Sequence, residues 1–225
     1  MATAAAAIFD LDGTLVDTLD DLTDALNHVL AHQGYPPRTR DECRHFIGDG
    51  ARIFMQRAMP APAREDDHAV DAMLAGFRIY YTAHLIERTR LYDGIAPLLD
   101  RLEQRGIPKA IVSNKPDDMT QDVVRRLLAP WQWALVTGDK PGLPRKPDPT
   151  GALQAVEALQ VDPARCLFVG DSGIDMATGR RASLIPVGVL WGFRQADELQ
   201  AHGARHLVTT PAELAPLLQD RSLIR

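Results

Sequence analysis

The feature that most constrains the fold is an alternation, after Tyr92-Asp93-Gly94, of short apolar runs with stretches of helical periodicity. The runs are bounded by glycine or polar residues, which is typical of buried strands. Strands that alternate with helices of this length form a parallel sheet with helices on both faces. Together with a first run near the N-terminus, the predicted strands are 4–9, 109–112, 133–136, 166–169, 185–190 and 206–208.

The segment after the first run has a different pattern. From Thr18 to His32 the apolar residues recur at helical spacing, and residues 65–88 form a second long helical stretch. No good strand candidate interrupts them. We therefore predict an α/β fold in two domains. Residues 1–14 and 93–225 form a Rossmann-like parallel-sheet core, and residues 15–92 form a helical domain inserted after the first strand.

Composition narrows the class of protein. The 225 residues are 45% hydrophobic and 24% charged, as in soluble globular proteins. The net charge of -5 gives no basic excess for nucleic acid or an anionic membrane, so neither is expected as a partner. Cys43 and Cys166 lie outside any CxxC spacing, which argues against a zinc site or a redox pair. Met1–Phe9 lacks the basic start of a signal peptide. We expect a cytoplasmic protein, a monomer or a homodimer.

Polar side chains follow four of the predicted strands. In an open parallel sheet, ligands bind at the carboxyl ends of the strands, so all four clusters should converge on one edge. The clusters are, in chain order, Asp10 with Asp12, Ser113 with Asn114, Lys146, and Asp171 with Asp175.

These residue types suit a divalent cation and a phosphoryl group. Carboxylates that share a small space repel each other, and a cation relieves that repulsion. All the candidate ligands are oxygens, which favours Mg²⁺ over Zn²⁺. One lysine and one serine add donors for phosphoryl oxygens. A carboxylate held there can attack phosphorus, and a second one two residues later can donate and accept the proton.

Four segments resemble the motifs of the haloacid dehalogenase-like phosphatases, in the order of that family. They are Phe9–Asp17 (FDLDGTLVD), Ser113-Asn114, Lys146–Pro149 (KPDP) and Gly170–Asp175 (GDSGID). The helical insert resembles the helical cap of the family. Within the family, Ile47–Gly50, Ser113–Pro116 and Trp191–Arg194 look most like phosphoglycolate phosphatases.

The resemblance implies a role for each acidic residue and for the lysine. Asp10 would be the nucleophile and a Mg²⁺ ligand. Asp12 would be the general acid/base, and its backbone carbonyl would also bind the metal. Asp171 would bind Mg²⁺, and Asp175 would bind it or orient a bound water. Lys146 would hold a phosphoryl oxygen and offset charge around Asp10.

The resemblance also implies a set of substrate contacts. Ser113 would hold phosphoryl oxygens, and Asn114 beside it is a further candidate for substrate binding. In the helical domain, Gly50 and Arg52 are candidates to meet the end of the substrate that carries no phosphate. For Arg52 the favoured interpretation is an ordinary surface position on a helix, and the substrate contact is the alternative.

The activity implied is that of a Mg²⁺-dependent phosphatase for a small phosphate ester. The leading substrate is 2-phosphoglycolate, converted to glycolate and phosphate through an aspartyl-phosphate intermediate. Two enzymatic alternatives stay open, a β-phosphoglucomutase-like phosphomutase and a phosphatase for another small ester. A phospho-receiver module would also use an acidic cluster, Mg²⁺ and a lysine, but it needs no helical insert and a much shorter chain.

Overall fold

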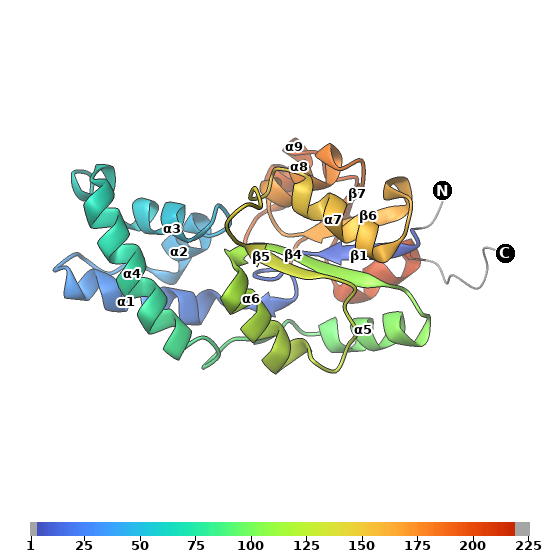
Figure 1. Cartoon of the computed structure of the whole chain (residues 1–225), viewed down its shortest axis with the longest axis horizontal. Coiled ribbons are helices and arrows are strands. Elements are labelled where there is room, and N and C mark those ends of the chain that lie inside the picture. The colour runs from blue at the N-terminus through green and yellow to red at the C-terminus, as the bar shows by residue number, and fades with distance from the viewer. Residues whose placement is uncertain (1–3, 219–225) are drawn as a thin grey trace. The chain divides into compact units, whose positions relative to one another are not determined.

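The chain divides into two compact units. The computed structural model describes residues 4–218. Met1–Val16 and Leu91–Arg225 form one unit, here called the core unit, and Asp17–Arg90 form the other, the helical unit (Figure 1). The sequence prediction placed the two boundaries between the domains at residues 14–15 and 92–93. The outermost parts of the predicted core domain, 1–3 and 219–225, lie outside the described residues.

A six-stranded sheet forms the centre of the core unit. Its order is β5-β4-β1-β6-β7-β8, and each of these pairings is parallel. The strands are β1 (Ala6–Phe9), β4 (Lys109–Pro116), β5 (Val136–Asp139), β6 (Cys166–Gly170), β7 (Ile185–Val189) and β8 (His206–Val208). The order places β1 between β4 and β6, so the polar residues that follow these three strands are neighbours. The predicted α/β class with a Rossmann-like parallel sheet is confirmed.

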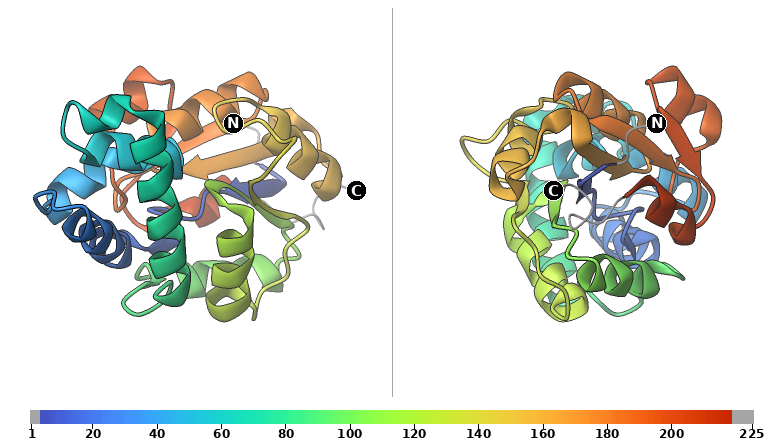
Figure 2. Two further views of the ribbon diagram at one scale, coloured as in Figure 1. Left: turned by 60° about the vertical axis from the view of Figure 1, so that its left-hand side comes forward. Right: turned by 90° about the vertical axis from the view of Figure 1, so that its right-hand side faces the viewer.

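Helices cover both faces of this sheet. Figure 1 and the left view of Figure 2 show α7 and α8 on one face and α5 and α6 on the other. The helices of the core unit are α5 (Ile95–Gln104), α6 (Asp117–Val123), α7 (Thr150–Leu159), α8 (Gly173–Arg181) and α9 (Ala196–Ala201). A π-helical turn, Val124–Leu128, continues α6, and short 3₁₀ segments span Pro163–Arg165 and Pro211–Leu217.

The core follows from the alternation of side chains along the strands. Every second residue of β1, β4 and β6 points to the same face of the sheet and packs against α7. The strand members of this buried cluster are Ala6, Ile8, Ala110, Val112, Cys166 and Phe168. Burial raises the pKa of the Cys166 thiol to about 12, so it serves as an inert packing group. Cys43 is also buried.

One predicted strand was misplaced. The segment 133–136 was expected to be a strand, but pairing with β4 starts at Val136, opposite Ile111. Trp133 lies before the strand, where its indole N–H donates to the Leu128 carbonyl oxygen at 3.2 Å. Its ring meets Phe9 edge-on, with ring centroids 6.4 Å apart. The backbone of Ala134 and Leu135 still hydrogen-bonds to Lys109 and Ile111 of β4, whereas the apolar character of Trp133 reflects side-chain packing.

The helical unit contains α1 (Leu19–His32), α2 (Arg40–Phe46), α3 (Ala51–Ala58) and α4 (Asp67–Ala83), with a 3₁₀ turn at Ala63–Glu65. Two short strands, β2 (Val16–Asp17) and β3 (Arg90–Leu91), lie where the chain passes between the core unit and the helical unit. The Asp21 carboxylate fixes the exit segment, because it accepts hydrogen bonds from the backbone N–H groups of Arg88 and Thr89. Within residues 4–218, no helix has the length and apolar character to cross a lipid bilayer.

Candidate active site

Three carboxylates and one lysine meet at the carboxyl ends of β1 and β6. Oxygens of Asp10, Asp171 and Asp175 all lie within 4.8 Å of one another. The Lys146 ammonium lies between two of these groups, 2.8 Å from Asp10 Oδ1 and 2.7 Å from Asp175 Oδ1. All four residues are buried. The predicted convergence of Asp10, Lys146, Asp171 and Asp175 is therefore what the fold produces.

Local contacts orient each member of this acidic cluster. Asp10 Oδ1 also accepts the backbone N–H of Leu11 at 2.7 Å. Asp175 lies in the first turn of α8, where Ser172 and Asp175 form a reciprocal capping box. Asp175 Oδ2 accepts the Ser172 hydroxyl at 2.6 Å, while its Oδ1 accepts Lys146. Asp175 thus joins the start of a helix to the site lysine, and its role toward a metal stays a prediction.

The electrostatics of the cluster favour a cation. Burial raises the pKa of Asp10 to about 7, although Lys146 opposes the shift. Burial and the neighbouring charges of Asp175 and Asp10 raise the pKa of Asp171 well above its usual range. Burial would lower the pKa of Lys146, but the two carboxylates beside it raise the value above normal. An all-oxygen group that binds protons this readily fits a hard divalent cation such as Mg²⁺.

Without a divalent metal, the contribution of Asp10 to the free energy of unfolding should fall as pH rises from 3.8 to about 7. Folded Asp10 keeps its proton up to about pH 7, whereas the unfolded side chain releases it near 3.8. The folded state binds more protons in this window, so each pH unit costs up to ~1.4 kcal/mol for this group. Urea unfolding of metal-free wild type and Asp10→Asn across the window tests this. An equal pH dependence in the two proteins would contradict it.

Asp171 is held by a segment distant in the sequence. Its Oδ2 accepts the backbone N–H of Phe193 at 2.7 Å, and its Oδ1 accepts the Thr14 hydroxyl at 3.3 Å. The indole N–H of Trp191 donates to the Thr14 carbonyl oxygen at 3.0 Å. The loop 191–194 therefore braces both the first and the fourth motif. The sequence analysis singled out residues 191–194 only because they resemble a family motif, and it predicted no structural role for them.

Gly192 allows that loop to approach the cluster. A Cβ at residue 192 would lie 2.3 Å from the Asp171 Cβ and 2.4 Å from the Gly13 carbonyl oxygen. Gly192→Ala should therefore displace Asp171 and weaken Mg²⁺ binding by about 10- to 100-fold, the usual cost of disturbing a ligand's support. A Mg²⁺ titration of activity measures this. Gly76→Ala on α4, where the added Cβ makes ordinary contact, is the control. Equal half-saturating Mg²⁺ in both variants would refute the expectation.

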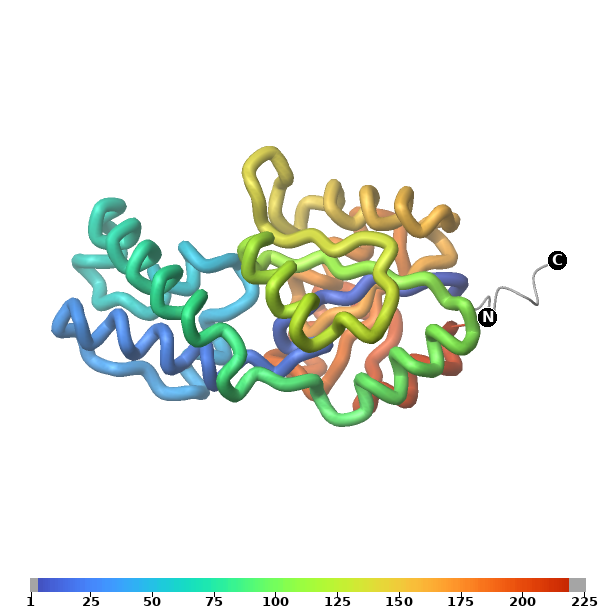
Figure 3. Tube along the Cα trace, turned by 60° about the horizontal axis from the view of Figure 1, so that its bottom comes forward, coloured from blue at the N-terminus to red at the C-terminus, as the bar shows by residue number. Residues whose placement is uncertain are grey.

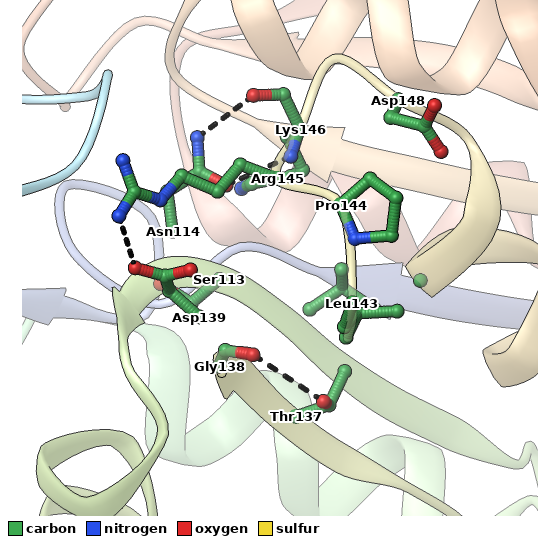
Figure 4. A pocket seen from close by; sticks show the side chains of 12 residues that line it. Ser113, Asn114, Thr137, Gly138, Asp139, Leu143, Pro144, Arg145, Lys146 and Asp148 are labelled. Carbon is green, nitrogen blue, oxygen red and sulfur yellow. Dashed lines mark hydrogen bonds and ion pairs between the residues drawn. The ribbon is translucent and has the colours of Figure 1, made fainter. Parts of the chain in front are cut away.

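Asn114 and Ser113 lie at the end of β4. The Asn114 side chain is clamped to the backbone of Lys146, as Figure 4 shows. Its Oδ1 accepts the Lys146 N–H at 2.9 Å and its Nδ2 donates to the Lys146 carbonyl oxygen at 3.0 Å. Ser113 Oγ accepts the Lys115 N–H at 3.2 Å. Asn114 thus helps to fix Lys146, and a direct substrate contact from Asn114 or Ser113 stays a prediction.

The loop between β5 and α7 carries Lys146. The tube in Figure 3 traces it as a narrow excursion of the chain. An ion pair between Arg145 Nη2 and Asp139 Oδ2, at 2.7 Å, ties the loop to the end of β5 (Figure 4). Beside this pair is a cavity of about 10 Å³, about the space for one water. The loop is therefore anchored at Arg145 as well as at Lys146.

The two candidates from the helical domain, Gly50 and Arg52, lie in the helical unit. Gly50 precedes α3 with a φ of 92°, a conformation that favours glycine. The Arg52 guanidinium pairs with Asp67 and Asp71 of α4. This pairing gives Arg52 a structural function on the helix surface, and the role of both residues in substrate binding stays a prediction.

Sequence reasoning gave no role to Lys115, which lies in the site. The Lys115 ammonium lies 3.1 Å from both carboxylate oxygens of Asp12. The signal available was its position directly after Ser113-Asn114, at the end of a strand whose other residues are buried. A lysine is usually exposed, but at this position in a buried strand its side chain is buried.

Comparisons with known proteins agree with this geometry. The model of the haloacid dehalogenase-like hydrolase family matches residues 4–183. A phosphoglycolate phosphatase of Agrobacterium fabrum is 37% identical over 188 residues, which cover 83% of this chain and 81% of the relative. An N-acetylmuramic acid 6-phosphate phosphatase of Pseudomonas aeruginosa is 34% identical over 220 residues, 97% of this chain and 96% of the relative. A solved structure from Lactobacillus delbrueckii subsp. bulgaricus, provisionally named phosphoglycolate phosphatase, has a TM-score of 0.89 at 33% identity, covering 96% and 99%.

The parallel sheet, the acidic cluster at its edge and these matches place the chain in the haloacid dehalogenase-like hydrolase family. The sequence expectation of this family is confirmed. Within it, the curated relatives identify the chain as a phosphatase, an enzyme that acts on small phosphate substrates.

Proposed function

We propose that this phosphatase hydrolyses 2-phosphoglycolate to glycolate and phosphate, with Mg²⁺ and through an aspartyl-phosphate on Asp10. The observation that carries the proposal is the buried Asp10–Lys146–Asp175 arrangement with Asp171 beside it. It offers a carboxylate nucleophile, an ammonium for phosphoryl oxygens and an oxygen site for a cation.

The proposed reaction has two steps, each with a defined proton transfer. A carboxylate oxygen of Asp10 attacks phosphorus, the bond to the ester oxygen breaks, and that oxygen takes a proton from Asp12. Asp12 then accepts a proton from water, whose oxygen attacks phosphorus and returns the bonding electrons to Asp10. Lys146, pinned between Asp10 and Asp175, holds positive charge at the phosphoryl group. Mg²⁺, bound by Asp10, Asp171 and the Asp12 carbonyl, would supply further charge compensation.

The substrate is the finer part of the proposal. One curated relative is named for phosphoglycolate and another for N-acetylmuramic acid 6-phosphate. Both names describe a small organic acid that carries a phosphate ester. The second substrate is therefore a specific competitor, favoured by the relative that covers more of this chain.

Phosphate release from a panel of esters, with Mg²⁺ and with EDTA, tests the proposal. The panel contains 2-phosphoglycolate, N-acetylmuramic acid 6-phosphate, sugar phosphates and nucleotides. We expect metal-dependent release with 2-phosphoglycolate giving the highest kcat/KM. A higher value for another ester would replace the substrate and keep the chemistry. Isomerisation of a sugar phosphate without net release would point instead to the phosphomutase alternative.

The remaining expectations concern assembly and location. A monomer or homodimer and a cytoplasmic location stay predictions, as does the absence of nucleic acid and membrane partners. Light scattering of the purified protein measures the mass directly, against 24.8 kDa for one chain.

A further inference from the structure

Lys115 is a buried lysine whose ammonium faces the proposed acid/base. Its Nζ lies 3.1 Å from Asp12 Oδ1 and 3.1 Å from Asp12 Oδ2. The Lys115 side chain is 2% exposed and that of Asp12 is 14% exposed. Lysine is rarely buried to this degree without a partner of opposite charge, so the pair is a built feature of the site.

Contacts with neighbouring residues hold the backbone from which this lysine projects. The Lys115 carbonyl oxygen accepts the hydroxyl of the buried Thr120 at 3.2 Å. Gly138 of β5 lets the neighbouring strand approach, because a Cβ there would lie 2.5 Å from the same carbonyl oxygen. The Lys115 N–H donates to Ser113 Oγ at 3.2 Å. The pairing of β4 with β5 is irregular between Val112 and Pro116, but these contacts hold the Lys115 backbone there, which suits its ammonium to hold another side chain in place.

We propose that Lys115 is a positioning residue that holds the Asp12 carboxylate toward the ester oxygen of the substrate. The inference rests on the proposed function, in which Asp12 gives a proton to that oxygen and later takes one from water. An ammonium that contacts both carboxylate oxygens restricts rotation of the Asp12 side chain. Proton transfer requires such alignment, so the effect of Lys115 is exerted through Asp12.

The two site lysines have different tasks in this arrangement. Lys146 contacts Asp10 and Asp175, on the side of the nucleophile. Lys115 contacts Asp12, on the side of the leaving group. Loss of Lys115 should therefore impair proton transfer and leave the binding of the phosphoryl group intact.

The same strand offers a matched control. Lys109, at the start of β4, is also buried, with 1% of its side chain exposed, and pairs with Glu103 at 2.7 Å. It lies at the opposite end of the strand from the acidic cluster. Lys109→Met removes the ion pair of another buried lysine without touching the site, so it reports the purely structural cost of such a change.

The test compares Lys115→Met and Lys115→Gln with Lys109→Met on two esters. With 2-phosphoglycolate, whose alkoxide needs a proton to leave, we expect both Lys115 variants to lose about 10- to 100-fold in kcat/KM. With p-nitrophenyl phosphate, which releases a stable phenolate, the loss should be several times smaller. Lys109→Met should match wild type on both esters, and inhibition by inorganic phosphate should be unchanged throughout. In an Asp12→Asn background, Lys115→Met should cause no further loss.

Several outcomes would overturn the proposal. They are equal losses on the two esters, a loss matched by Lys109→Met, weaker phosphate inhibition in the Lys115 variants, or a further loss in the Asp12→Asn background. The activity of the wild-type protein distinguishes a failure of the proposed function from a failure of the role proposed for Lys115. If wild type hydrolyses neither ester, the proposed function itself fails, whereas an active wild type with unimpaired Lys115 variants refutes only the role of Lys115.

Discussion

Asp10→Asn should abolish phosphate release, with a fall in kcat of roughly 10⁴-fold or more, the scale seen when a covalent nucleophile is removed. The amide cannot attack phosphorus, so no aspartyl-phosphate forms. The fold should persist, because the amide side chain has the same shape as the carboxylate and can still accept the Leu11 N–H. Lys146 also keeps Asp175 as its anionic partner. The loss should thus be chemical rather than structural.

The measurement is steady-state phosphate release together with thermal unfolding. Asp162→Asn is the control, since Asp162 caps the short 3₁₀ turn before β6 and lies outside the acidic cluster. It should retain wild-type kcat. Release by Asp10→Asn at the wild-type rate would show that another group attacks phosphorus and would remove the central step of the proposed reaction.

Removal of the divalent metal should reduce activity about as much as Asp10→Asn does. It should also lower the stability of the folded protein. EDTA should reduce phosphate release to background. Mg²⁺ at about 100 times its Kd should stabilise the folded protein by ~2.7 kcal/mol, because it binds the assembled cluster and not the unfolded chain. For a chain of this size that corresponds to a rise in Tm of roughly 5–10 °C.

Asp171→Asn separates the metal from other effects of added salt. Burial and the neighbouring carboxylates make ionised Asp171 unfavourable in the metal-free protein, as its raised pKa indicates. The metal-free variant should therefore be at least as stable as metal-free wild type, and Mg²⁺ should not raise its Tm. Asp139→Asn, which changes a carboxylate paired with Arg145, should keep the full Mg²⁺ response. A response that survives in Asp171→Asn would place the metal elsewhere.

The convergence of the site could be predicted because it depends on topology. Parallel strands end at one edge, so polar residues after β1, β4 and β6 must meet there. The sequence therefore predicted that Asp10 and Asp171 lie together, as they do in the structure, without any knowledge of side-chain contacts. The start of β5, the strand before Lys146, was harder to predict. Trp133 is as apolar as a strand residue, yet it lies before the strand and packs against Phe9 of β1.

The partners of individual side chains could not be predicted in the same way. The clamp of Asn114 on the Lys146 backbone depends on the path of a proline- and glycine-rich loop. The pairing of Lys115 with Asp12 depends on where β4 ends, and the strand extends to Pro116 rather than stopping at Val112. Hydrophobic periodicity reports which residues are buried, but it does not report which polar atoms meet.

The brace of Asp171 by Phe193 has a consequence for how the enzyme is made. Asp10, the first aspartate of the cluster, leaves the ribosome long before Phe193, whose N–H group orients Asp171. A nascent chain that ends before Phe193 carries its carboxylates without the brace. The contiguous segment Asp17–Arg90 emerges long before and, as domains generally do during synthesis, can fold first. Catalytic competence is therefore acquired only after residue 193 has been made, and a product that stops before it contains the residues of β1, β4 and β6 but lacks both the brace and β8.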